Sequence, residues 1–251
     1  MSSEETITRL SIGGRQFVLV GTAHVSRESV DEVEGIIRGE QPDTVCVEID
    51  QSRYKSMVEG QSWSSLNIHQ VLKERKGFLL IANLVLSSFQ KRLGKDLGTS
   101  PGQEMKRAIE VSQELGIPFV FSDREIHVTL RRAWKKTGFW GKNKMLAALL
   151  SSIFTNEKLS ADEIEKLKEK SAIQDMMEEL AGYLPAAKAV LIDERDQYLA
   201  TRIFESKGTK VIAVVGAGHV NGIVEWLENL GAGTQVSDLS AIEQVPPASR
   251  F

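Results

Sequence analysis

Two copies of one short pattern constrain the fold of this chain more than any other feature. Each copy is an apolar run, then Gly-x-x-His, then a segment with helical periodicity, at residues 17–38 and 211–230. Both apolar runs are short and rich in valine, which predicts buried strands. A strand that turns sharply into a helix needs the backbone freedom and close approach of glycine. The glycines concerned are Gly21, Gly216 and Gly218. Two histidines, His24 and His219, therefore each follow the carboxyl end of a predicted strand.

Turn signals and apolar periodicity predict the other elements. Gly13-Gly14 is a two-residue turn that joins strands at 6–12 and 16–20 into a hairpin. A capping box from Ser29 to Glu32 begins the first helix, and Gly39 is expected to end it. Further strands are predicted at 45–49, 119–122 and 210–215, and helices at 29–38, 101–115, 126–136, 142–154, 160–170, 186–206 and 220–230.

Strands at both ends of the chain with helices between them predict an α/β fold. The near-continuous apolar runs favour a largely parallel central sheet flanked by helices. We predict one domain over residues 1–251, with mostly helical insertions at about 52–115 and 138–205.

Composition excludes several classes of protein. The 251 residues carry a net charge of −3, so no basic excess indicates a nucleic-acid partner. The single cysteine, Cys46, excludes an intramolecular disulfide and a cysteine-rich zinc site, and its apolar neighbours predict a buried thiol. The N-terminal residues lack the pattern of a signal peptide, and no apolar run reaches the ~18 residues of a membrane span. The two longest, at 78–89 and 145–154, predict buried or interfacial helices, with membrane contact as the alternative.

Polar side chains recur just beyond the predicted strands, where open α/β sheets bind ligands. Glu48 lies in the run at 45–49, and Asp123 and Arg124 follow the run at 119–122. Two imidazoles and a carboxylate, without a thiolate cluster, are the donors of a mixed nitrogen and oxygen site for a divalent metal. The alternative for each histidine is a hydrogen-bonded turn residue, and the duplicated pattern leaves both interpretations open. His69 and His127 lie in helical context and are predicted to be surface or structural groups.

Periodicity indicates which charged side chains point inward. Strand alternation puts Glu48 on the same face as Cys46, so it needs a cation, a donor or a proton, and a salt bridge to Arg53 or Arg124 is the structural alternative. Within the helix at 186–206, Arg195 and Asp196 both interrupt apolar rows. An ion pair or a contribution to a site is therefore favoured over a solvated charged face. Glu104 falls one turn before Ala108 in the same manner.

A dinucleotide fingerprint is the rival explanation for the second glycine motif. Gly216-x-Gly218-x-x-x-Gly222 follows a strand, and Asp238 comes after a further predicted strand at 233–237. Such a fold needs a complete βαβ half and normally a second one. Because only about 30 residues follow Gly222, we reject this interpretation.

Five stretches resemble the TraB/PrgY family, which is related to the Tiki proteins and more distantly to GumN-like and erythromycin-esterase-like proteins. They are residues 21–26, 47–53, 122–124, 194–196 and 215–223, with Ile49 where leucine is usual. The Tiki branch implies a metal-dependent peptidase supported by manganese or cobalt, with zinc or iron as alternatives. The resemblance makes His24, His219 and Glu48 the core, with Glu48 as a ligand or as the general base. It implies that arginines stabilise an oxyanion or pair with Glu48, namely Arg53, Arg124 and Arg195. Supporting positions are Gly21, Gly216, Gly218, Glu104, Asp123, Glu194 and Asp196.

The resemblance also keeps two other functions open. The PrgY branch implies a pheromone-signalling regulator that captures a peptide without cleaving it. A third hypothesis is a structural or oligomeric membrane-associated adaptor that uses the apolar runs at 78–89 and 145–154. The expected partner is a peptide or protein substrate, with no nucleic acid, and a homodimer is an open alternative. Many prokaryotic members of the family continue into membrane helices, so a membrane anchor outside this chain is also an expectation.

Overall fold

The computed structural model describes residues 6–22, 27–59, 102–144, 147, 182 and 184–246. The chain divides into two compact units. The first consists of residues 1–50, 99–124 and 192–244, and the second of residues 51–98, 125–191 and 245–251. The prediction of one domain with helical insertions stays a prediction.

The first unit is built on a sheet that confirms the predicted α/β fold. Among the described residues five strands pair in the order β1-β2-β5-β3-β4. β1 runs antiparallel to β2, and the other neighbouring pairs are parallel. The predicted hairpin is confirmed, because Gly13 and Gly14 adopt positive φ angles of 57° and 78° between its strands. The strands are β1 (Ile7–Ile12), β2 (Arg15–Thr22), β3 (Thr44–Val47), β4 (Phe119–Phe121) and β5 (Lys210–Gly216).

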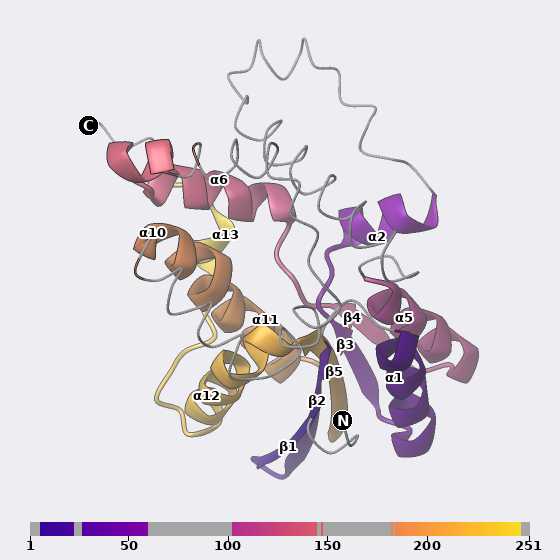
Figure 1. The fold of residues 1–251 in the computed structure, drawn as a ribbon. Coiled ribbons are helices and arrows are strands. Elements are labelled where there is room, and N and C mark those ends of the chain that lie inside the picture. The colour runs from indigo at the N-terminus through magenta and orange to yellow at the C-terminus, as the bar shows by residue number, and fades with distance from the viewer. Residues whose placement is uncertain are drawn as a thin grey trace. The chain divides into compact units, whose positions relative to one another are not determined.

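Helices cover both faces of this sheet (Figure 1). On one face lie α1 (Arg27–Glu40) and α5 (Gln103–Leu115), and on the other lie α11 (Glu194–Phe204) and α12 (Val220–Gly231). A sheet buried on both sides needs apolar residues at consecutive positions rather than alternate ones. The unbroken runs in β2 and β5 meet that need, since their residues 17–22 and 211–216 are buried.

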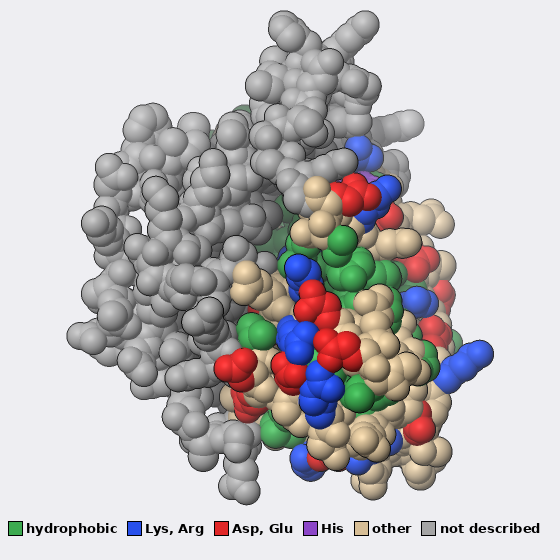
Figure 2. Space-filling view, turned by 90° about the vertical axis from the view of Figure 1, so that its right-hand side faces the viewer, with side chains coloured by type: hydrophobic (Ala, Val, Ile, Leu, Met, Phe, Trp, Pro, Cys, Tyr) green, Lys and Arg blue, Asp and Glu red, His purple; other side chains and the backbone are tan. Residues whose placement is uncertain are grey.

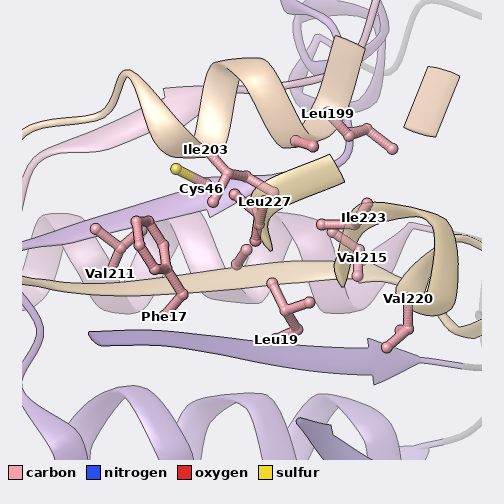
Figure 3. Close-up of a cluster of buried hydrophobic side chains, with 12 residues drawn as sticks. Phe17, Leu19, Cys46, Leu199, Ile203, Val211, Val215, Val220, Ile223 and Leu227 are labelled. Carbon is pink, nitrogen blue, oxygen red and sulfur yellow. The ribbon is translucent and has the colours of Figure 1, made fainter. Parts of the chain in front are cut away.

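The hydrophobic core on the α11–α12 face fixes the position of α11, the helix that carries Glu194, Arg195 and Asp196. Figure 3 shows Phe17 and Leu19 of β2 and Val211 and Val215 of β5 among side chains from α11 and α12. The core residues from the two helices include Leu199, Ile203, Ile223 and Leu227, all with 0% exposure. Full burial of each such side chain contributes about 1.5–3 kcal/mol. This packing fixes α11 against the sheet, so its polar residues have a defined place.

Ion pairs join the two helices on the opposite face. Arg107 of α5 reaches Glu34 of α1 with Nη2–Oε1 at 2.8 Å, and Arg38 pairs with Glu34 at 2.8 Å and also with Glu114. Acidic and basic side chains interleave on this face in Figure 2. The pairs are partly exposed, so they give a modest, salt-sensitive link between α1 and α5.

Several predicted boundaries are wrong, each for a physical reason. Helix α1 begins at Arg27, so Ser29 lies inside it and does not cap it. It continues through Gly39 to Glu40 and ends before Pro42, which disfavours helical geometry at the preceding residue. That residue, Gln41, has a φ of 42°.

The helix predicted at 186–206 and the strand predicted at 233–237 also differ from the structure. The first consists of α10 (Pro185–Lys188), a π-helical turn η2 (Ala189–Asp193) and α11. The residues at 233–237 form turns and irregular backbone, so the strand predicted directly before Asp238 is absent. This removes the remaining support for a dinucleotide fingerprint.

The described part of the second unit is helical. It contains α2 (Gln51–Val58), α6 (Ile126–Lys136) and α10, and residues 139–144 are helical as well. The predicted helix at 126–136 is confirmed, and α6 packs against α10. The apolar run at 78–89, most of the run at 145–154 and the helix predicted at 160–170 lie outside the described residues. Within the described ranges no helix has both the length and the apolar composition needed to cross a bilayer.

Candidate functional site

The two Gly-x-x-His segments leave neighbouring strands in the first unit. β2 and β5 are parallel and in register, so that Thr22 pairs with Gly216 at their carboxyl ends. After β2 the chain enters α1 on one face, and after β5 it enters α12 on the other. Such a switch point is where open α/β sheets bind ligands. His24 follows Thr22 by two residues and lies outside the described residues, so its predicted role stays a prediction.

His219 is held in one orientation by a buried carboxylate. It ends the 3-10 turn η3 (Ala217–His219), is 6% exposed, and has its Nδ1 2.5 Å from Oδ1 of Asp196 on α11. Burial raises the pKa of the Asp196 carboxyl, while the hydrogen bond with His219 opposes that rise. A carboxylate at Nδ1 favours the tautomer with the proton on that nitrogen. Nε2 then presents its lone pair on the other side of the ring.

Gly222 makes room for this carboxylate. A Cβ at position 222 would lie 2.0 Å from Oδ2 of Asp196 and 2.5 Å from its Cγ. Position 222 lies about one turn after His219 on α12, and only glycine there leaves room for the Asp196 carboxylate against this helix. We included this glycine in a nucleotide motif and in the stretch at 215–223, but predicted no role for it in the site. Its signal was a helix-weakening residue inside an apolar helical pattern, which usually has a packing or functional reason.

Arg195 lies at the centre of a cluster of charged and polar side chains that includes Glu48, Asp123 and His219. Its guanidinium donates to both carboxylate oxygens of Asp123, from Nε at 3.1 Å and from Nη2 at 2.8 Å. Nη2 also donates to Oε1 of Glu48 at 2.6 Å, and Nη1 lies 3.0 Å from Nε2 of His219. Burial acts to lower the pKa of Arg195, but the charges of Asp123 and Glu48 outweigh it and raise that pKa. The forked pairing fixes both the position and the charge of this side chain.

Glu48 connects the cluster to the end of β5. It lies just beyond β3, is 7% exposed, and its Oε2 accepts the backbone N–H of Gly216 at 2.6 Å. Its Oε1 lies 3.6 Å from Nε2 of His219. Glu48 is buried, as its place on the strand predicts, and of the predicted cation, donor or proton it has both a cation, Arg195, and a donor, the Gly216 N–H. One of the predicted glycine positions, Gly216, thus contributes a backbone donor to the site.

A second buried ion pair lies alongside. Nη1 of Arg124 donates to Oε2 of Glu194 at 2.7 Å and to the carbonyl oxygen of Ile242 at 2.9 Å. The backbone N–H of Arg124 donates to Oδ1 of Asp123 at 2.8 Å. Arg124 therefore links Asp123 and Glu194 to α13 (Ser240–Glu243).

The remaining predicted positions lie in three places. Glu104 is 2% exposed on α5, and Arg53 lies on α2 in the second unit. A Cβ on Gly21 would come 2.9 Å from Cγ2 of Val220, which agrees with the close approach predicted there. Gly218 lies in η3 directly before His219. The site roles predicted for Glu104 and Arg53 stay predictions.

Comparison with known proteins identifies the family. A family model described as the TraB/PrgY/gumN family matches residues 6–234. The chain belongs to this family. This TraB/PrgY/gumN chain is 36% identical over 228 residues to an uncharacterized protein of Methanocaldococcus jannaschii. That match covers 90% of the chain and 56% of the archaeal protein. The chain is also 30% identical over 272 residues to the human TraB domain-containing protein, in a match that covers 97% of the chain and 70% of the human protein. The mouse TraB domain-containing protein is also 30% identical, with the same coverage.

Two donor atoms of this TraB/PrgY/gumN site have nearly the spacing of ligands on one divalent metal, but the Arg195 guanidinium contacts both atoms. Two ligand atoms of one metal at about 2.1 Å lie roughly 3–3.5 Å apart, close to the 3.6 Å between His219 Nε2 and Glu48 Oε1. A carboxylate on the other ring nitrogen, here Asp196, is the usual partner of a metal-bound histidine. The described residues alone contain no group of three or more histidine, cysteine or acidic side chains arranged to hold a metal ion. In this arrangement Arg195 Nη1 lies against the same Nε2 lone pair, so this contact and a metal bond are alternatives.

Proposed function

We propose that this chain is a metal-dependent hydrolase that cleaves amide bonds in peptides. One observation carries the proposal. The imidazole of His219 is fixed through Nδ1 by Asp196, while its Nε2 and Oε1 of Glu48 lie 3.6 Å apart beside the guanidinium of Arg195. A metal-binding histidine, a carboxylate that serves as ligand or as base, and a donor to the oxyanion are groups that metal-assisted hydrolysis uses.

His24 completes the donor set in this proposal. It follows Thr22, whose strand neighbour Gly216 begins the segment that ends at His219. Two residues of chain span at most about 7 Å, so the proposal has His24 reach the site from the end of β2. The Gly-x-x-His segment that contains His24 thus starts from β2, the neighbour of the strand that precedes His219. Manganese or cobalt is the expected ion, with zinc or iron as alternatives.

The residues of the cluster have separate tasks. A divalent ion held by His24, His219 and Glu48 would acidify a bound water and polarise the substrate carbonyl. Asp196 holds the His219 ring, and Glu48 either serves as a ligand or accepts the proton of the attacking water through Oε1. Asp123 and Glu48 hold Arg195, whose N–H groups donate to the oxygen on which negative charge develops.

A metal-supplemented assay on a peptide library tests this function. Wild type should cleave peptides only after manganese or cobalt is added, and His219→Ala and His24→Ala should lose both metal binding and turnover. His127→Ala is the matched control, because His127 is exposed and pairs with the nearby exposed Glu125. Metal-dependent turnover retained in either site variant would refute the assignment. Glu48→Gln separates the two roles of that residue, since a general base can be lost while metal affinity is kept.

Peptide capture without cleavage is the second candidate. The contact between Arg195 Nη1 and His219 Nε2 favours it, because it satisfies the lone pair that a metal would need. This alternative predicts saturable peptide binding with no turnover in manganese, cobalt, zinc or iron. It also predicts that His219→Ala weakens peptide binding in the absence of any metal.

A further inference from the structure

We propose that the second unit carries a docking surface for membranes that contain anionic lipids. The surface is formed by the end of α6 and the helical residues at 139–144 that follow it. We name it the basic-aromatic patch. Its residues are Arg131, Lys135, Lys136, Phe139, Trp140, Lys142 and Lys144.

The aromatic part of the patch is unusually exposed. Phe139 is 69% exposed and Trp140 is 79% exposed, and no other aromatic side chain is among the exposed large hydrophobics of the described residues. The two rings contact each other edge to face, with centroids 5.8 Å apart. Single exposed apolar side chains need no explanation, but a contiguous aromatic pair indicates a surface that another phase or partner covers. Tryptophan in particular favours the interface between lipid headgroups and acyl chains.

The charge around the aromatic pair is one-sided. Residues 126–156 contain six basic side chains and no acidic one, whereas the rest of the chain has 25 basic and 34 acidic side chains. Of the six, Lys136 and Lys144 are exposed, and Lys142 places its Nζ 5.5 Å from the ring centre of Trp134. A local basic cluster in a chain with a net charge of −3 is complementary to an anionic surface.

The arrangement favours a membrane over single-stranded RNA. RNA-binding platforms present open ring faces along a groove so that successive bases stack on them. Here the rings of Phe139 and Trp140 are tilted by 76° against each other, so they form a compact wedge rather than a stacking row. Aromatic residues flanked by lysine and arginine are typical of segments that lie in the membrane interface.

Vesicle co-sedimentation of the full chain tests the proposal. Wild type should bind vesicles of phosphatidylcholine with phosphatidylglycerol and should bind phosphatidylcholine alone far more weakly. Neutralising Lys136 and Lys144 to glutamine should lower the partition coefficient about 25-fold, since each charge is worth about fivefold at an anionic surface. Lys55→Gln with Lys207→Gln is the control, because it removes the same charge at two other exposed lysines.

The aromatic pair is tested in the same assay. Phe139→Ser with Trp140→Ser should reduce binding by about tenfold or more, and Val236→Ser, at a side chain 77% exposed, should leave it unchanged. Trp140→Phe should keep binding but lose most of the fluorescence quenching by brominated lipid. Equal loss of binding in the lysine control, or wild-type binding in the serine double variant, would overturn the proposal. So would binding to single-stranded RNA with none to anionic vesicles.

Discussion

Gly222→Ala tests the arrangement of Asp196 and His219, because two known effects oppose each other. Alanine in the interior of α12 should gain about 0.5–1 kcal/mol of helix propensity. The new Cβ would lie 2.0, 2.5 and 2.9 Å from Oδ2, Cγ and Cβ of Asp196, so the whole buried carboxylate must move. That movement breaks the bond to His219, which costs about 1–3 kcal/mol, and crowding adds about 1–3 kcal/mol. We therefore expect a net loss of about 3 kcal/mol in the free energy of unfolding.

Gly35→Ala is the matched control for this prediction. Gly35 lies within α1, and a Cβ there would meet no atom within 4 Å. This variant should be neutral or more stable by up to about 1 kcal/mol. Urea titration followed by circular dichroism measures both changes. Nitrogen-15 shifts of the His219 ring report its tautomer, which should change in the Gly222 variant alone. An unchanged or increased stability of Gly222→Ala with a wild-type His219 tautomer would refute the reasoning.

Three further predictions concern other buried or paired groups. Arg124→Met leaves Glu194 buried without this ion pair and should cost about 3 kcal/mol or more, whereas adding Glu194→Met should recover part of that loss in urea titration. Burial raises the pKa of the Cys46 thiol to about 11, so a thiol reagent should react with it only after denaturant is added. Hydrogen bonds from arginines, with Arg107 the stronger, lower the pKa of Glu34 from 4.5 to about 2. Glu34→Gln should therefore be less stable than wild type near pH 7, and the difference should vanish as pH falls from about 5 to about 2.

The sequence predicts the fold well where local signals suffice. The Gly13-Gly14 hairpin, the strands at 119–121 and 210–216 and the helix at 126–136 follow from turn chemistry and apolar periodicity. Helix ends are less predictable. Gly39 was expected to end α1, but it is helical, and the helix ends at Glu40 because Pro42 disfavours helical geometry at Gln41. The π-helical turn at 189–193 is invisible to a 3.6-residue period, although it directly precedes Glu194 and sets the direction of the residues after it.

The site is predictable in its residue types but not in its pairings. Periodicity indicates that Glu48, Arg195 and Asp196 point inward, and all three lie in the cluster. Arg195 meets Glu48 because α11 packs close to the end of β3 in space, although the two residues are 147 positions apart in the sequence. The bond from Asp196 to His219 depends on Gly222, whose role emerges only when α11 and α12 pack together. No local pattern carries such information, because it arises from tertiary contacts.

Pulsed electron paramagnetic resonance of manganese-loaded protein labelled with nitrogen-15 histidine tests the central claim most directly. The proposed site predicts coupling of the ion to two histidine nitrogens in wild type and to one in each of His24→Ala and His219→Ala. His127→Ala should keep both couplings. Bound manganese without any histidine coupling, or with wild-type coupling in His219→Ala, would contradict the account.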